Sequence, residues 1–156
     1  MRAFSVAGLI VVLVVAGGGP DPVAAQDQAA VVQVVEQFFE GMRTRDSVVM
    51  QRTVAPLARL IAVTPGGEAR SIPMADFIRS VAGRPQVLDE RVFDPEVRMA
   101  DRLATVWVAY DITIDGTFSH CGFDAFHLSL LSDGWRITQI ADTRQTTGCT
   151  TPRAPR

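Results

Sequence analysis

Two Asp-Gly dipeptides constrain the second half of this 156-residue chain. Asp115-Gly116 and Asp133-Gly134 each lie between apolar segments that are rich in β-branched and aromatic residues, and Asp-Gly is a strong signal for a two-residue hairpin turn. A looser apolar segment, which contains Pro95, precedes them. The pattern therefore predicts consecutive antiparallel strands over 91–99, 103–114, 117–131 and 135–143.

The first half of the chain has helical rather than alternating periodicity. Apolar residues from Val31 to Met42 recur at helical spacing, which predicts an amphipathic helix over 28–44 with Asp27 as its N-cap. The turn and cap signals that follow predict a short helix at 47–53, a hairpin of strands 57–63 and 68–72, and a third helix at 74–82. Helices followed by a run of strands predict one α+β domain over 26–150, with the helices packed on one face of a curved sheet.

The two ends of the chain are expected to lie outside this domain. Arg2 is followed by a short apolar run and then by small residues that end at Ala25. This order is typical of a secretory signal peptide over 1–25, cleaved after Ala25, and it predicts a secreted or periplasmic protein. The alternative is a retained membrane anchor, but the run is shorter than the ~20 residues that a membrane-spanning helix needs. The tail at 151–156 is predicted to be disordered.

Charge and motif content exclude several function classes. The chain has 15 basic residues, all of them Arg, against 17 acidic residues, for a net charge of −2. It therefore lacks the basic field that nucleic-acid binding requires, and we expect no membrane association after signal cleavage. No zinc-ligand spacing and no Gly-rich phosphate loop occurs, so neither a metal nor another cofactor is predicted.

The two cysteines, Cys121 and Cys149, are predicted to form a disulfide in an exported chain. Regular hairpin pairing places Cys121 opposite Thr146, from which a bending tail can bring Cys149 within the ~6 Å Cα separation that a disulfide needs. The alternative is a pair of free thiols.

Regular pairing from the two hairpin turns also assigns residues to the faces of the sheet. It places Asp111 opposite His120 and Trp107 opposite Asp124, on the same face as an apolar zone that contains Phe126, Leu128, Leu130 and Ile137. The other face then carries Val106, Val108, Tyr110 and Phe123. Because the helices can cover only one face, we expect a homodimer that buries Val106, Val108 and Phe123.

The order of elements and three segments resemble a known superfamily. The segments read GTFSHCGFDAF at 116–126, DGWRI at 133–137 and ADTR at 141–144. They resemble the nuclear transport factor 2-like superfamily, and in particular its secreted bacterial SnoaL-like or lumazine-binding branch. The resemblance implies a cone-shaped fold, in which three N-terminal helices pack on a curved antiparallel sheet around a pocket. It implies no particular reaction, because this fold hosts enzymes and binding domains alike.

Two functions are consistent with the polar and aromatic residues of the predicted pocket. The first is binding of a small apolar molecule of unknown identity, with Trp107, Phe126, Phe38, Phe77 and Arg144 as ligand-binding residues. The second is proton transfer on a small carbonyl compound, with His120 as base, Asp111 orienting it and Asp124 as acid. A third possibility is that the polar residues form a hydrogen-bonded cluster with a purely structural role.

Overall fold

The computed structural model describes residues 22–149 and forms an α+β fold. Its elements, in chain order, are α1 (Pro22–Thr44), α2 (Ser47–Thr53), β1 (Val54–Val63), β2 (Ala69–Pro73), α3 (Met74–Ala82), β3 (Leu88–Ala100), β4 (Leu103–Ile114), β5 (Thr117–Leu131) and β6 (Gly134–Thr143). Helix α1 begins at Pro22, so the predicted start near residue 28 is wrong and Asp27 lies inside the helix. Most of the predicted signal peptide and all of the predicted tail lie outside the described residues.

The six strands form one mixed sheet, with the order β2-β1-β6-β5-β4-β3. All neighbouring pairs are antiparallel except β1 and β6, which run parallel. The predicted all-antiparallel sheet is therefore imprecise, as is the prediction that all three helices are N-terminal, because α3 follows β2. Turns fix the relative direction of consecutive strands, but no turn joins β1 to β6.

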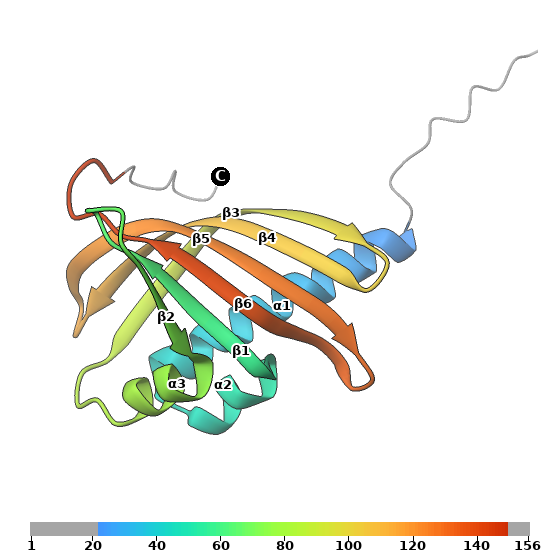
Figure 1. The fold of residues 1–156 in the computed structure, drawn as a ribbon, viewed down its shortest axis with the longest axis horizontal. Helices are drawn as coiled ribbons and strands as arrows, with labels where there is room; N and C mark the ends of the chain where they lie inside the picture. The colour runs from blue at the N-terminus through green and yellow to red at the C-terminus, as the bar shows by residue number, and fades with distance from the viewer. Residues whose placement is uncertain (1–21, 150–156) are drawn as a thin grey trace, which may run out of the picture.

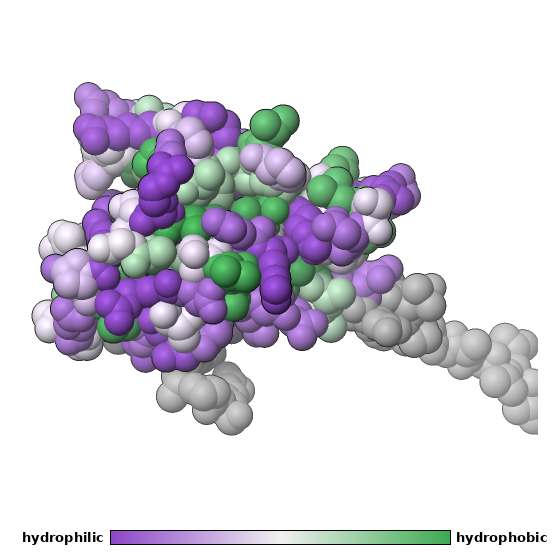
Figure 2. Space-filling view, turned by 90° about the horizontal axis from the view of Figure 1, so that it is seen from below, coloured by the Kyte–Doolittle hydropathy of each residue, from purple (hydrophilic) through white to green (hydrophobic). Residues whose placement is uncertain are grey.

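The helices lie together on one side of the curved sheet (Figure 1). The apolar stripe of α1 is buried against the sheet as predicted, and Asp46 caps α2 by accepting hydrogen bonds from the backbone N–H groups of Val48 and Val49. The face seen from below is mixed, with hydrophobic side chains in separate groups between hydrophilic ones (Figure 2). Within residues 22–149, no helix is both long enough and apolar enough to cross a membrane.

A β-bulge changes the faces of the central hairpin. Thr113 pairs with Phe118 as the turn predicts, but Ile112 pairs with His120, so that Ser119 is an extra residue on β5. Beyond the bulge, every β4 residue faces a β5 partner one position later than predicted. Regular counting from the turn cannot detect this extra residue, and the predicted pairing of Asp111 with His120 and of Trp107 with Asp124 is wrong.

The second hairpin keeps its predicted face despite two differences. Leu128, rather than Leu130, pairs with Ile137, because the two-residue turn is formed by Ser132 and Asp133, one residue earlier than predicted, which shifts the pairing by two residues. A further bulge at Thr138 then pairs Phe126 with Ile140. Phe126 and Ile137 are both fully buried in the core under the helices, as predicted.

The disulfide between Cys121 and Cys149 is formed, with a Cα–Cα separation of 5.9 Å. Cys121 pairs with Gln145 rather than with the predicted Thr146, through two backbone hydrogen bonds of 2.9 Å each. The disulfide therefore holds the segment after β6 beside the bulged end of β5.

Candidate functional site

A cavity of about 550 Å³ lies between the concave face of the sheet and helices α1 and α3. Its helical wall is apolar: Phe38, Phe39 and Met42 project from α1, and Phe77 and Val81 project from α3. Phe38 and Phe77 stack across the two helices, with ring centroids 6.2 Å apart. The helical spacing that buries these residues therefore also builds one wall of the cavity.

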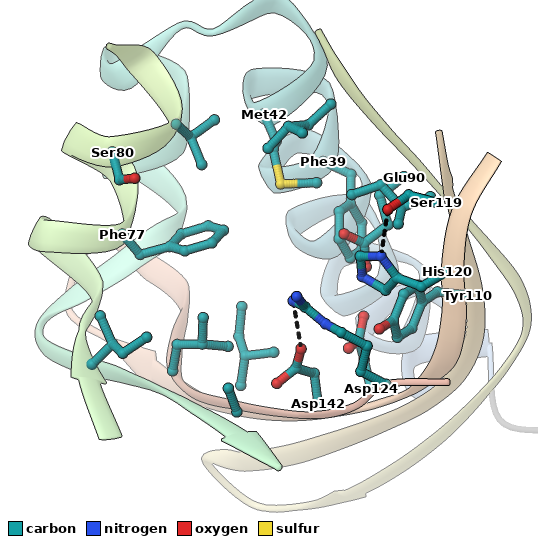
Figure 3. Close-up of a pocket in the computed structure, with 18 of the residues that line it drawn as sticks. Phe39, Met42, Phe77, Ser80, Glu90, Tyr110, Ser119, His120, Asp124 and Asp142 are labelled. Atoms are coloured by element: carbon teal, nitrogen blue, oxygen red, sulfur yellow. Dashed lines mark hydrogen bonds and ion pairs between the residues drawn. The ribbon is translucent and has the colours of Figure 1, made fainter. Parts of the chain in front are cut away.

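The opposite wall is polar. Figure 3 shows Glu90, Tyr110, His120, Asp124 and Asp142 gathered on the sheet, across the cavity from Phe77 and Ser80 of α3. These five side chains come from four neighbouring strands, β3 to β6. Asp124 and Asp142 are directly opposite each other in the β5–β6 register. Two carboxyl groups in this position repel each other if both are ionised.

Burial controls the protonation of the carboxyl groups. The pKa of Glu90 is well above its usual value, first because the group is desolvated and then because it hydrogen-bonds to Asp124 and faces its charge. The pKa of Asp124 is raised to about 7, mainly by burial; the hydrogen bond from Glu90 opposes this rise, and the charge of Asp142 adds to it. In this pair Glu90 is therefore the hydrogen-bond donor and Asp124 is the acceptor.

Asp142 lies beside this pair and has one oxygen without a partner. Its Oδ2 atom is 3.7 Å from Nη2 of Arg144, whereas its Oδ1 atom is buried and has no hydrogen-bond partner. Burial raises the pKa of Asp142, and the Arg144 guanidinium opposes that rise. The site therefore contains an acceptor oxygen whose hydrogen-bonding capacity is unused.

His120 is held as a neutral imidazole. Desolvation, and then the positive charge of Arg144, lower its pKa to about 4. Its Nδ1 atom lies 2.9 Å from the hydroxyl of Ser119, the bulge residue. At neutral pH the imidazole is therefore unprotonated, but it is a weaker base than an ordinary histidine.

Tyr110 stands edge-on to His120, with ring centroids 5.9 Å apart. Its hydroxyl donates a hydrogen bond of 2.8 Å to the backbone carbonyl of Thr143, and burial raises its pKa above the usual value. The position of the Tyr110 ring requires a glycine at position 122, because Gly122 is the β5 residue that pairs with Tyr110. A Cβ atom at position 122 would lie 2.0 Å from the Thr143 carbonyl oxygen and 2.9 Å from Cε1 of Tyr110.

Five of the residues predicted for the site are brought together around the cavity. They are His120, Asp124, Phe38, Phe77 and Arg144. Phe126 lies one layer deeper, fully buried and edge-on to Phe39 at 5.7 Å.

Asp111 and Trp107 do not belong to this site, because the bulge turns both to the outer face. Asp111 forms a two-point ion pair with Arg91, with distances of 3.0 Å and 2.9 Å. Trp107 is 48% exposed and stacks on Phe123 at 5.3 Å. The same bulge turns Val106, Val108 and Tyr110 inward, so the prediction that they lie on the outer face is wrong.

The polar residues of the cavity that were not predicted from the sequence include Glu90, Tyr110 and Asp142. Asp142 lies two residues before Arg144, which was predicted for the site. Glu90 lies just before the predicted strand, between Asp89 and Arg91, so no alternating pattern marked it, and its face depends on the β3–β4 register. Among residues 22–149, no group of three or more His, Cys, Asp or Glu side chains could hold a metal ion.

Comparisons with known proteins show the family to which this chain belongs. The family model described as "Putative lumazine-binding" matches residues 26–140, and the chain belongs to that family, within the nuclear transport factor 2-like superfamily. No curated protein matches the chain.

Solved structures share the fold at low sequence identity. An NTF2-like protein of unknown function from Shewanella baltica is 17% identical, with a TM-score of 0.62 over 78% of this chain and 95% of that one. A conserved protein from Planctomyces limnophilus is 15% identical, with a TM-score of 0.67 over 78% and 98%. A "putative dehydratase" of the NTF2-like family from Streptomyces avermitilis is 17% identical, with a TM-score of 0.65 over 78% and 98%.

Proposed function

We propose that this protein is an exported domain that binds a small, mostly apolar molecule in the cavity between α1, α3 and the sheet. The observation that carries the proposal is the make-up of the cavity, which combines aromatic and aliphatic walls with one cluster of polar groups. Ligand sites are usually built in this way, because apolar walls supply affinity while a few polar groups fix orientation. The lumazine-binding description of the family is consistent with this proposal.

The size of the cavity supports a small organic ligand. Its volume of about 550 Å³ lies within the roughly 300–1,000 Å³ that is usual for ligand pockets. Most of its lining residues come from helices and strands, so the cavity does not depend on a mobile loop to exist.

A fluorophore assay tests whether the cavity takes up apolar molecules. N-phenylnaphthylamine is neutral and becomes fluorescent in apolar surroundings, and we expect saturable enhancement with the wild-type protein. Ala62→Phe should abolish it, because Ala62 lines the cavity opposite Asp142 on the neighbouring strand. Leu57→Phe adds the same ring to the same strand at a position that is 91% exposed, and it should leave the signal intact.

Two further observations complete this test. Asp111→Ala should also bind the fluorophore normally, since Asp111 pairs with Arg91 on the outer face. Native mass spectrometry of the purified protein would show a retained ligand as an adduct that denaturation releases. Equal fluorescence enhancement by the wild type and by Ala62→Phe would refute the proposed binding site.

The second candidate function is proton transfer on a small carbonyl compound, and the Glu90–Asp124 pair favours it. A carboxyl group with a pKa of about 7 can both accept and return a proton at neutral pH. In such a reaction the Asp124 carboxylate would take a proton from the carbon beside the carbonyl, and a proton would return two carbons further along. The double bond moves and no atom is gained or lost. His120, with its low pKa, would not be the base.

An isomerisation assay separates this candidate from binding alone. A β,γ-unsaturated cyclohexenone is the probe, and its conversion into the conjugated ketone is followed by ultraviolet absorbance. An enzyme should lose turnover in Asp124→Asn while still binding N-phenylnaphthylamine, and His120→Ala should retain more turnover than Asp124→Asn. If the wild type binds N-phenylnaphthylamine but does not convert the cyclohexenone, the enzyme candidate is wrong for this substrate class and only the binding function stands.

A further inference from the structure

We infer that the polar end of the cavity selects ligands whose polar group is a cationic nitrogen with N–H donors, such as a protonated amine, over alcohols and carboxylates with the same skeleton. This inference rests on the proposed function, because it concerns the same cavity. It specifies the chemical class of the ligand, which the family description and the similar structures leave open.

The first argument is the balance of charge inside the cavity. Three carboxyl groups, on Glu90, Asp124 and Asp142, lie together at the polar end of the cavity, where the guanidinium of Arg144 lies 3.7 Å from Asp142. Burial raises the pKa of all three carboxyl groups, so each of them takes up its negative charge at a cost that a cation beside it would reduce. His120 is neutral, so the carboxyl groups at this end outnumber the cation beside them.

The second argument is the balance of hydrogen-bond donors and acceptors. The hydroxyl of Tyr110 already donates to the Thr143 carbonyl, and the hydroxyl of Ser119 is engaged with His120. Oδ1 of Asp142 is buried without a partner. A buried acceptor without a donor costs about 1–3 kcal/mol. A ligand that brings N–H groups recovers this energy, whereas a carboxylate brings only further acceptors.

The third argument is the placement of two acidic residues directly opposite each other. Asp124 is 2% exposed, lines the cavity, and contacts the carboxyl of Glu90. Its cross-strand neighbour on the other side is Asp142, the residue with the unpartnered oxygen. A cation seated against both residues would remove their mutual repulsion and would form charge-assisted hydrogen bonds.

Two further arginines at the cavity, Arg70 and Arg84, do not reverse this preference. Both are exposed to solvent. Water and salt screen exposed charges strongly, whereas charges inside a low-dielectric cavity are screened much less. The buried carboxyl groups therefore dominate the field at the polar end.

Three naphthalene probes test the inference by calorimetric titration at neutral pH: naphthylmethylamine, naphthylmethanol and naphthoate. We expect the amine to bind about ten-fold or more tightly than the alcohol, which corresponds to one charge-assisted hydrogen bond. The carboxylate should bind most weakly. Asp142→Asn and Asp124→Asn should each reduce the ratio of amine to alcohol affinity about ten-fold, whereas Asp111→Ala should leave that ratio unchanged.

Each other outcome has a defined meaning. If the alcohol or the carboxylate binds as tightly as the amine, and Ala62→Phe abolishes all binding, the cavity is a ligand site and the inference is wrong. The inference is equally wrong if N-phenylnaphthylamine binds but no naphthalene probe does. If neither the fluorophore nor any probe binds, the proposed function itself fails. Arg144→Gln offers an independent check, since removal of this cation should strengthen amine binding relative to the alcohol.

Discussion

Asp124 and His120 lie on the same strand and line the same cavity, yet burial moves their pKa values in opposite directions. Asp124 rises from an ordinary 3.8 to about 7, while His120 falls from 6.5 to about 4. Desolvation disfavours whichever form is charged, which is the deprotonated acid and the protonated base. Between about pH 4 and 6.5, the two residues therefore make opposite contributions to the pH dependence of stability.

Substitution of Asp124 should expose this opposition. The folded protein keeps the Asp124 proton to higher pH than the unfolded chain does, so its contribution to the free energy of unfolding falls as the pH rises from about 4 to 7. In Asp124→Asn that fall is removed. The difference in free energy of unfolding between the variant and the wild type should therefore increase, in favour of the variant, by about 1–2 kcal/mol from pH 5 to pH 7.

Urea denaturation across this pH range measures the difference, with His120→Ala as the opposite case. In His120→Ala, the contribution that rises from about pH 4 to 6.5 is lost. If the free energy of unfolding depends on pH in the same way for the wild type and Asp124→Asn, the raised pKa of Asp124 is contradicted. Several charged or titratable groups face the pair from the elements around the cavity, and their own variants serve as further controls: Glu90, Tyr110, Asp142, Arg144, Arg70 and Arg84.

At the residue scale, the sequence allowed prediction of His120 and Asp124 as cavity residues but not of their partners. Both alternate with Phe126 and Leu128 along one face of the strand, and this spacing is visible in the sequence. Their neighbours depend on the bulge at Ser119, which no local signal marks. Because of this one extra residue, His120 pairs with Ile112 instead of Asp111. Asp111, one of the three predicted catalytic residues, therefore lies on the outer face.

At the element scale, the close packing of β4, β5 and β6 depends on a missing side chain. Gly122→Ala should lower the free energy of unfolding by about 3 kcal/mol, because its Cβ would overlap the Thr143 carbonyl and displace the ring of Tyr110. Gly66→Ala is the matched control, since its Cβ would meet only the Thr64 hydroxyl at 3.8 Å. Thermal unfolding of both variants checks this, and equal melting temperatures would contradict it.

The disulfide provides the second prediction at this scale. It links residues 28 positions apart, and loss of such a crosslink costs roughly 3 kcal/mol in the chain-entropy model. A Cys121→Ala/Cys149→Ala variant should therefore unfold at a lower urea concentration than the oxidised wild type. Its urea midpoint should equal that of the wild type after reduction. Peptide mapping without reductant should recover the linked pair. Alkylation of both thiols in unreduced protein would contradict the crosslink.

Local chemistry explains which elements could be predicted. The helical stripe, the Asp46 cap and the two Asp-Gly turns each act within a few residues, and each is found where the sequence places it, to within a few residues. The parallel pairing of β1 with β6 is different, because it joins strands from opposite ends of the domain. Nothing within either strand encodes its partner, so this pairing emerges only from the packing of the whole chain.

At the scale of the whole molecule, the outer face of the sheet leads to a prediction of association. Trp107 and Phe123 stack there, 48% and 41% exposed, on the face that the helices leave uncovered. We expect a homodimer through this pair, rather than through Val106 and Val108, which point inward. Trp107→Lys should shift the sedimentation coefficient to that of a monomer, whereas Leu57→Lys, on β1, should not. A monomeric wild type at micromolar concentration would contradict this prediction.

Export is the second prediction for the whole molecule. N-terminal sequencing of the protein recovered from the periplasm or medium should begin at Gln26. Cleavage there leaves Val31 in place, which is the first fully buried residue within 27–44 of α1. A variant without residues 2–25 should stay in the cytoplasm. Exported protein with a mass that includes residues 1–25 would contradict cleavage.

The parallel pairing of β1 with β6 also determines when the domain can fold. Leu60 pairs with Ile140, and Ala62 pairs with Asp142, near the C-terminal end of the sheet. Contacts this distant in sequence close slowly, because a long loop must be ordered before they form. Since β6 is the last strand to leave the ribosome or a translocation channel, β1 and β2 lack their sheet partner until then. The cavity, whose wall includes both strands and Asp142, is therefore among the last parts of the molecule to be completed.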